Sequence, residues 1–421
     1  MSDQTNTGPV VAADGRPLKQ SLQRALRRQK LRALALIAPL LIFILVAFIA
    51  PIGDMLFRSI ENEIVSETLP HTVVALKDWN YESGEMPDEA VFAALAQDLL
   101  VAVKSKTHTK LGSRLNYEMS GMSSLFRQTG RKVKRMDPEQ PWREQFLKVN
   151  AKWGDPAVWG VIQTYSSPYT AGYFLNAIDL RLAPEGVEKR PEKERVYVML
   201  FKRTILLSGL ITFMTFLLGY PIAYLLSNLR MKTANILMIL VLLPFWTSLL
   251  VRTSAWKVLL QQQGVINDIL VWLGILADDN RLELINNATG TVIAMTHILL
   301  PFMILPLYSV MKTIPPSYVR AAKSLGATPL TAFRRVYFPQ SIPGIGAGAI
   351  LVFILAIGYY ITPALVGGTK GTFISNRIAY HISSSLNWGL GAALGALLLV
   401  LVMALYALYD KIVGIDNVKL G

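Results

Sequence analysis

Long apolar runs alternate with shorter polar stretches along this chain. Six of the runs are about as long as the roughly 20 residues that a helix needs to cross a bilayer. The pattern predicts membrane helices at about 33–56, 204–228, 236–258, 289–311, 342–366 and 386–409. We therefore expect an all-α fold, a polytopic membrane protein with six transmembrane helices.

The first apolar run follows a stretch, 1–32, that begins polar and becomes basic toward its end. This run is longer than the 7–15 apolar residues of a signal peptide, and no small-residue cleavage site follows it. The pattern therefore predicts a basic tail and then an uncleaved first span.

Residues 57–201 separate the first span from the second and carry too many charges to enter lipid. Helical patterns at 88–103, with Asp88 as a cap, and at 142–153 are accompanied by many aromatic residues. We expect a small, mostly helical domain inserted between spans one and two.

Two stretches of this insertion, 104–110 and 131–135, are strongly basic. A solvated charged face explains them more simply than a nucleic-acid site. His71 and His108 stand alone in the sequence, and no spacing predicts a metal or catalytic site.

Composition agrees with a membrane protein, since 52% of the residues are hydrophobic and only 17% are charged. The net charge of +14 does not require a nucleic-acid partner, because cytoplasmic flanks of membrane helices are rich in lysine and arginine. The chain has no cysteine, which excludes disulfides, zinc–thiolate sites and thiol nucleophiles.

The short basic loops predict the orientation. The tail 1–32, the loop 230–233 and the loop 315–339 fall on one side of a six-span arrangement, and the positive-inside rule makes that side cytoplasmic. Both termini, including the tail 416–421, are then cytoplasmic. The insertion lies outside, in the periplasm, because long loops translocate largely regardless of charge.

The polar island 315–339 predicts two short helices joined at a glycine. Pro315 and Pro316 suit the start of the first helix, and Gly326 suits its left-handed end. Thr328 before Pro329 is typical of the cap of a second helix. Such helices can dock into a groove on a soluble partner, although an amphipathic loop lying on the membrane surface remains an alternative.

This island resembles the cytoplasmic EAA loop of bacterial ABC importer permeases, in which Glu-Ala-Ala, a glycine and Ile-x-Leu-Pro stand at fixed spacing. The spacing matches throughout, although an arginine replaces the glutamate and two apolar residues differ. The matching positions are Arg320, Ala321, Ala322, Gly326, Val336, Phe338 and Pro339.

The resemblance continues over about 200–415. The stretches PFWTSLLVRTSAW (244–256), GVINDIL (264–270), YYITPALVGG (359–368) and NWGLGAAL (387–394) are similar to the spermidine/putrescine branch of these permeases. The resemblance implies a type I importer in the bacterial inner membrane. Its partners would be a second permease subunit, a periplasmic solute-binding protein and separate ATPase subunits.

The same resemblance implies that this chain is not an enzyme and holds no cofactor or metal, with ATP and Mg²⁺ bound by the ATPase. The sequence agrees, because it contains no G-x-x-x-x-G-K-[ST] phosphate-binding loop.

Residues that contact the solute are harder to predict, because no Asp or Glu lies in the middle of any predicted span. Intramembrane ionisable groups and aromatic faces are the remaining candidates, although each also fits packing or an interfacial belt. The candidate translocation path comprises Tyr220, Trp246, Arg252, His297, Tyr359, Tyr360 and Thr362.

The sequence thus predicts a permease subunit that moves a polyamine-like cation into the cytoplasm. Relatives in the broad family that carry thiamine, iron, phosphonates or opines leave the solute open. A solute carrier working without an ATPase is the alternative from another class, and an enzyme or sensor anchored by the helices is a third.

Overall fold

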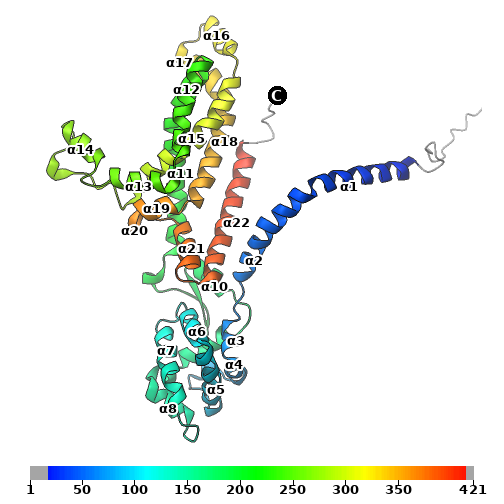
Figure 1. The fold of residues 1–421 in the computed structure, drawn as a ribbon, viewed down its shortest axis with the longest axis vertical. Coiled ribbons are helices and arrows are strands. Elements are labelled where there is room, and N and C mark those ends of the chain that lie inside the picture. Colours follow the sequence, from blue (N-terminus) through cyan, green and yellow to red (C-terminus); the bar gives the residue numbers. More distant parts are fainter. Residues whose placement is uncertain (1–17, 414–421) are drawn as a thin grey trace, which may run out of the picture. The chain divides into compact units, whose positions relative to one another are not determined.

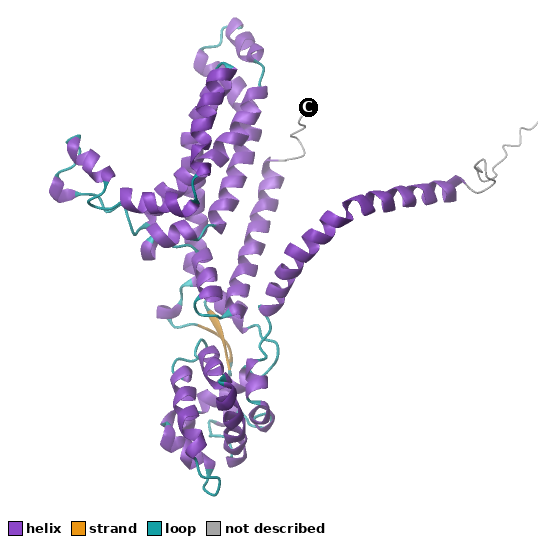
Figure 2. Ribbon diagram, in the orientation of Figure 1, coloured by secondary structure: helices purple, strands orange, loops and turns teal. Residues whose placement is uncertain are grey.

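The computed structural model describes residues 18–413, so the predicted tail 416–421 and most of the basic tail lie outside the described residues. The described chain is mostly helical, with one short β-hairpin (Figure 2). It divides into two units, residues 1–58 and 59–421. Among residues 18–413 five helices are long and apolar enough to cross a membrane, or six if one bent pair counts as a span. The predicted all-α membrane fold is confirmed.

The first unit is one long helical segment. It comprises α1 (Leu18–Ile44), a π-helical turn (Leu45–Ile49) and α2 (Ala50–Arg58). The candidate membrane span within it, Leu26–Arg58, contains the predicted range 33–56 and buries none of its most apolar window within the unit. Exposed apolar side chains all round are what a helix in lipid presents.

Three helices form the centre of the second unit, namely α11 (Tyr197–Asn228), α15 (Ala288–Thr313) and α18 (Phe338–Gly358). They pack along one another (Figure 1). α15 is the most buried of the candidate spans. Its side chains Met295, Leu299, Met303 and Leu307 are fully buried in the cluster that joins the three helices.

Glycines allow α18 to approach α15 closely. A Cβ at Gly344 would lie 3.2 Å from the carbonyl oxygen of Pro306, and one at Gly348 would lie 2.7 Å from the sulfur of Met303. The last span, α22 (Trp388–Val413), packs against α21 (Ile374–Ser383) and α10 (Gly172–Ala177). There Gly391 faces Ile382, whereas a Cβ at Gly395 would meet no atom within 4 Å.

The predicted third span, 236–258, is not one helix. It comprises α12 (Met231–Leu242), a 3-10 turn (Leu243–Trp246) and α13 (Leu249–Leu259), and the two arms are bent by 93°. Pro244 has no amide hydrogen for the helix ladder, and the Ser248 side chain caps the new helix by accepting from the amide of Val251 at 3.2 Å.

The predicted fifth span, 342–366, is also interrupted. α18 ends at Gly358, and the extended backbone at Tyr359 precedes α19 (Ile361–Val366). Two carbonyl groups at the break find partners on α21, because Ser375 Oγ donates to Tyr359 O at 2.6 Å and Asn376 Nδ2 donates to Tyr360 O at 2.7 Å. These side chains satisfy backbone groups that would be costly to leave unpaired in a membrane protein.

Short elements connect these spans. α14 (Val265–Trp272) follows α13, α20 (Gly368–Gly371) follows α19, and a 3-10 turn lies at Asp278–Asn280. The cytoplasmic-loop candidate contains α16 (Pro316–Ser324), α17 (Pro329–Ala332) and a π-helical turn (Phe333–Tyr337).

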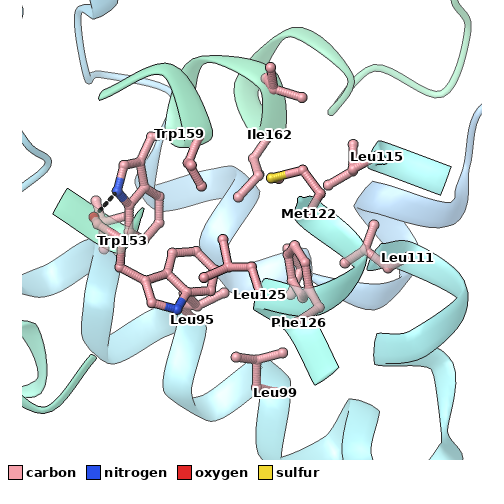
Figure 3. Close-up of a cluster of buried hydrophobic side chains, with 14 of the residues drawn as sticks. Leu95, Leu99, Leu111, Leu115, Met122, Leu125, Phe126, Trp153, Trp159 and Ile162 are labelled. Atoms are coloured by element: carbon pink, nitrogen blue, oxygen red, sulfur yellow. Dashed lines mark hydrogen bonds between the residues drawn. The ribbon is translucent and has the colours of Figure 1, made fainter. Parts of the chain in front are cut away.

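The insertion is a helical domain with its own core. Trp153, Trp159, Phe92 and Phe126 are fully buried at its centre, where the indole of Trp159 donates to the carbonyl oxygen of Trp153 at 2.9 Å (Figure 3). Its helices are α3 (Ile64–Thr68), α4 (Pro70–Ala75), α5 (Glu89–Ser105), α6 (Thr107–Leu115), α7 (Met122–Lys132), α8 (Trp142–Val149), α9 (Pro156–Thr164) and α10. Shorter 3-10 turns lie at Tyr81–Ser83, Val133–Arg135, Ala151–Gly154 and Glu192–Glu194.

Three details of the insertion differ from expectation. An antiparallel hairpin, β1 (Leu180–Ala183) with β2 (Gly186–Lys189), was not predicted. Asp88 occupies the cap position of α5 without a capping hydrogen bond from its side chain. His71 is not isolated, because its Nδ1 lies 2.7 Å from a carboxylate oxygen of the buried Asp98, which also accepts from Thr72.

Candidate functional site

The predicted EAA loop forms a helical hairpin whose turn is built as the sequence indicates. α16 ends at a left-handed glycine, since φ of Gly326 is +87°. The amide of Gly326 donates to Lys323 O and the amide of Ala327 donates to Ala322 O, both at 3.0 Å. Thr328 then caps α17 by accepting from the amide of Thr331 at 3.3 Å. The glycine terminator and the threonine cap are confirmed.

We expected the second helix of the loop to be a separate short helix, but the structure shows that it is not. α17 continues through the π-helical turn Phe333–Tyr337 directly into α18. A force applied to this hairpin therefore acts on a membrane helix without an intervening loop. The sequence analysis ended the loop at Pro339 and began the next span at 342, but proline is tolerated in the first turn of α18 and the helix runs through it.

Aromatic side chains pack the hairpin against the end of α11. The ring of Tyr337 lies 5.1 Å from that of Tyr224, and the ring of Phe338 lies 5.8 Å from that of Tyr220. The Tyr220 hydroxyl lies 3.0 Å from Ser341 Oγ. Tyr220 is also a predicted path residue, and the structure places its ring against the hairpin; its role in the translocation path stays a prediction.

The outer face of the hairpin is uncovered. Leu325 and Leu330 are 89% and 75% exposed, so they give the hairpin an apolar outer surface. Among the predicted EAA positions, Arg320, Ala321, Gly326 and Pro339 are exposed, and Ala322, Val336 and Phe338 are half-buried. Arg320 makes no ion pair with any other residue in the described part of the chain.

A second group of candidates gathers around α13, far from the hairpin. His297 lies sixteen residues before the end of α15, which is about 24 Å along the helix axis. Its Nδ1 accepts from the indole of Trp256 at 3.1 Å. On the neighbouring side of α13 the hydroxyl of Thr253 lies 3.1 Å from that of Thr362 on α19.

Arg252 belongs to the same group, which we call the α13 cluster: Arg252, Thr253, Trp256, His297, Tyr359 and Thr362. Its guanidinium is near enough to His297 and Tyr359 to act on both electrostatically. Its Nε and Nη1 atoms are buried and have no hydrogen-bond partner. Buried donors without a partner are costly, although the arginine as a whole is only half-buried.

The structure thus brings together four of the seven predicted path residues: Arg252, His297, Tyr359 and Thr362. Trp246 is 88% exposed on the turn between α12 and α13, and Tyr360 is exposed at the break before α19. Thr253 and Trp256 were not among the predicted site residues. The i, i+4 spacing of Arg252 and Trp256 on one helix was the available signal for Trp256.

Comparison with known proteins identifies the family. Residues 206–413 match the model of the binding-protein-dependent transport system inner membrane component. The spermidine/putrescine transport system permease protein PotB of Haemophilus influenzae is 36% identical over 216 residues, which cover 51% of this chain and 75% of that protein. PotB of Escherichia coli is 34% identical over 202 residues, covering 48% and 73%.

The chain belongs to this permease family. It is therefore a transport subunit of an ABC importer and not an enzyme, and it is a multi-pass protein of the inner membrane. Within the family it stands with the polyamine branch, as the sequence motifs indicated. A solved ABC transporter for the import of alginate has 17% identity, a TM-score of 0.47, and coverage of 70% of this chain and 99% of that chain. A resemblance at that level adds nothing about function.

The insertion of this permease lies outside the matched region, and a network of buried polar groups joins it to the core helices. Asp179 at the end of α10 has φ +61° and accepts from the amides of Val196 and Tyr197 at 3.0 Å and of Val198 at 2.8 Å. It thereby caps α11 with a negative charge, which the positive end of the helix dipole favours.

Two further contacts lie at this junction, one between the insertion and α22 and one between α11 and α21. The ring of Tyr173 packs against the backbone at Gly389, the second residue of α22. Tyr197 OH lies 2.9 Å from Nε2 of His381 on α21. Burial, and then the charge of Arg377, lowers the pKa of His381 to about 4.

A buried ion pair supports this junction. Arg114 donates to Glu118 at 2.6 Å and to Tyr173 OH at 2.8 Å, and Arg190 lies 3.7 Å from Glu118. Burial alone would lower the pKa of Arg114, but Tyr173 and Glu118 outweigh it, so the pKa is raised above its ordinary value. Arg114 and Glu118 are four residues apart, but their contacts with Tyr173 and Arg190 span separations that no local motif reveals.

Proposed function

We propose that this permease imports a polyamine-like organic cation, and that a separate ATPase drives it through the α16–α17 hairpin. The observation that carries the coupling role is the hairpin itself, which combines an uncovered apolar face with direct continuity into α18. A docked partner would cover Leu325 and Leu330, as helices in grooves cover their apolar anchors. ATP and Mg²⁺ would be bound by that ATPase, and this chain would hold no cofactor.

The orientation belongs to the same proposal. The hairpin and both termini are cytoplasmic, and the insertion is periplasmic, as the distribution of lysine and arginine in the short loops supports. A second permease subunit, identical or distinct, completes the transmembrane pathway. A periplasmic binding protein delivers the solute to its outer side.

The polyamine assignment is supported by the names of the two PotB relatives and is tested by uptake. Proteoliposomes that contain this permease, its partner permease, the ATPase and the binding protein should accumulate radiolabelled spermidine or putrescine when ATP is enclosed with the ATPase. The matched control carries an ATPase whose phosphate-binding lysine is replaced. Absence of ATP-dependent uptake of both compounds would remove the polyamine assignment.

One observation favours a second candidate, the import of a solute that carries an anionic oxygen, such as an opine or a phosphonate. The described residues of α11, α12, α13, α15, α18 and α19 include no Asp or Glu, while Arg252 presents unpaired donors. The same vesicles should then accumulate octopine rather than spermidine. A solute carrier that works alone is distinguished by purification, because it would not bring down an ATPase.

We assign the binding-protein contact to the insertion, from its predicted side of the membrane and its size. Deleting residues 60–195 should weaken affinity for the binding protein. Because the deletion also removes the Asp179 cap, basal ATPase activity of the assembled complex serves as the control for an intact core. Unchanged affinity in an assembled complex would refute this role.

A further inference from the structure

The insertion carries a strongly basic end. Its two basic stretches are separate in the sequence, at 104–110 and 131–135, but the fold brings them together. A Cβ added at Gly130 would lie 2.5 Å from the ring of His108 and 3.2 Å from Val103 Cγ2, so the end of α7 lies directly against the turn between α5 and α6. The exposed cations around this contact, which we call the basic end, are Lys104, Lys106, Lys110, Arg131, Lys132, Lys134 and Arg135.

The basic end is not neutralised by the rest of the chain. Among residues 18–413 none of its seven side chains has an ion-pair partner. The acidic residues that follow its second stretch are Asp137 and Glu139. Asp137 does not compensate the basic end, because it accepts from the amide of Glu139 at 3.0 Å and from Gln140 Nε2 at 3.1 Å. The fold therefore concentrates positive charge at one place, and an oppositely charged surface would be attracted to it.

The basic end lies where the α6–α7 pair is remote from the permease core. At the other end of this pair, the ring of Tyr117 lies 6.2 Å from that of His381 on α21. Between the two ends α6 runs from Thr107 to Leu115, which is about 12 Å along the helix axis. The basic end is therefore turned away from the core, and the headgroups of the membrane that holds the core are less accessible to it than a soluble protein is.

Carboxylates on a soluble protein are the chemistry that fits this surface. A free cationic solute would be repelled by it, so the basic end is not a stop on the route of a polyamine. We propose that the basic end binds an acidic face of the periplasmic solute-binding protein. This inference rests on the proposed function, because it requires a periplasmic insertion that contacts that protein. Exposed charge pairs contribute more to association rate and orientation than to affinity, so the basic end steers the binding protein toward the permease.

The test measures the association of solute-loaded binding protein with the complete importer in nanodiscs. The basic-end variant neutralises three exposed lysines, by Lys104→Gln, Lys132→Gln and Lys134→Gln. The matched control neutralises three exposed lysines elsewhere in the insertion, by Lys77→Gln, Lys189→Gln and Lys193→Gln. Both variants lose the same net charge and should keep the Tm of the wild type, because all six side chains are exposed and unpaired among residues 18–413.

Salt distinguishes steering by the basic end from other causes. At about 0.1 M salt, where the Debye length is ~10 Å, the basic-end variant should associate about tenfold more slowly than the wild type. At about 1 M salt the Debye length is ~3 Å, and the two rates should converge. The control should follow the wild type at both concentrations. Equal association rates of the wild type and the basic-end variant at about 0.1 M salt would overturn the inference.

Two further arms separate this inference from its alternatives. If deletion of 60–195 weakens affinity for the binding protein but the basic-end variant associates normally, the insertion uses another surface and only this inference fails. If neither change has an effect, the proposed role of the insertion fails with it. Phosphatidylglycerol vesicles test a lipid partner. Importer that binds these vesicles through the basic end, with unchanged association of the binding protein, would overturn the inference in favour of a membrane.

Discussion

Gly326 joins the two helices of the hairpin for which we propose a coupling role, and substitutions there test whether that role depends on the conformation of the turn. Its φ of +87° lies in the left-handed region, and a Cβ at this position would meet no atom within 4 Å. The cost of adding a side chain is therefore purely local. For an L-residue such as alanine it is about 1–2 kcal/mol, which lowers the population of the native turn about 5- to 30-fold relative to alternatives.

Three variants form a series at this position. Gly326→Asn should retain most function, because asparagine tolerates the left-handed conformation. Gly326→Ala should lose part of it, in line with the cost above. Gly326→Pro should abolish it, because proline fixes φ near −65° and removes the amide that donates to Lys323 O at 3.0 Å.

The assay is stimulation of the ATPase by solute-loaded binding protein in proteoliposomes, with the amount of permease in the membrane measured alongside. We expect the order Gly, Asn, Ala, Pro for stimulation, with equal membrane insertion of all four. Normal stimulation by Gly326→Pro would refute the coupling role of the hairpin. Equal losses in the Asn and Pro variants would refute the conformational argument.

Other substitutions test the packing and the junction. Gly348→Ala should destabilise the protein by about 1–3 kcal/mol, because the new Cβ would lie 2.7 Å from Met303 Sδ. The control Gly395→Ala should be neutral or slightly stabilising, because its Cβ would meet no atom within 4 Å. Equal Tm values of the two variants in detergent would contradict this packing argument. Asp179→Ala should cost at least the ~1–2 kcal/mol of a helix cap, and Asp179→Asn less, since asparagine keeps an acceptor and tolerates φ +61°; thermal unfolding measures both. The pKa of His381 is lowered to about 4, so folding is fully stable with respect to this group above its ordinary pKa of 6.5. As the pH falls from 6.5 to about 4, the protein should lose up to about 3 kcal/mol of stability. His381→Gln should flatten the pH dependence of Tm between these values, and an unchanged profile would exclude His381 as its source.

Much of this architecture could be predicted because its signals are local. The apolar runs gave the spans at 204–228 and 289–311 to within a few residues of α11's end and of both ends of α15. Gly326 and Thr328 were predictable because a left-handed residue and a cap are each determined by neighbours within four positions. EAA spacing and the PotB-like stretches carried the family assignment.

The structural features that could not be predicted depend on contacts between residues far apart in the sequence. The break at Tyr359 lies inside an unbroken apolar run and is stabilised by Ser375 and Asn376 of another helix. The contacts of Tyr220 with Phe338 and Ser341 likewise depend on another helix, α18. The pairing of His71 with Asp98 was hidden for the same reason.

We propose that the hairpin meets an ATPase in the cytoplasm while the insertion faces the periplasm, and the accessibility of single residues tests this most directly. The chain has no cysteine, so a single introduced thiol reports one position. We would place it at Lys323 on α16 or at Val74 in the insertion, where the side chain is 72% exposed. In intact cells a membrane-impermeant maleimide should label Val74→Cys and spare Lys323→Cys, which should react only after permeabilisation and should crosslink to the ATPase. Labelling of Lys323→Cys from outside would contradict the account.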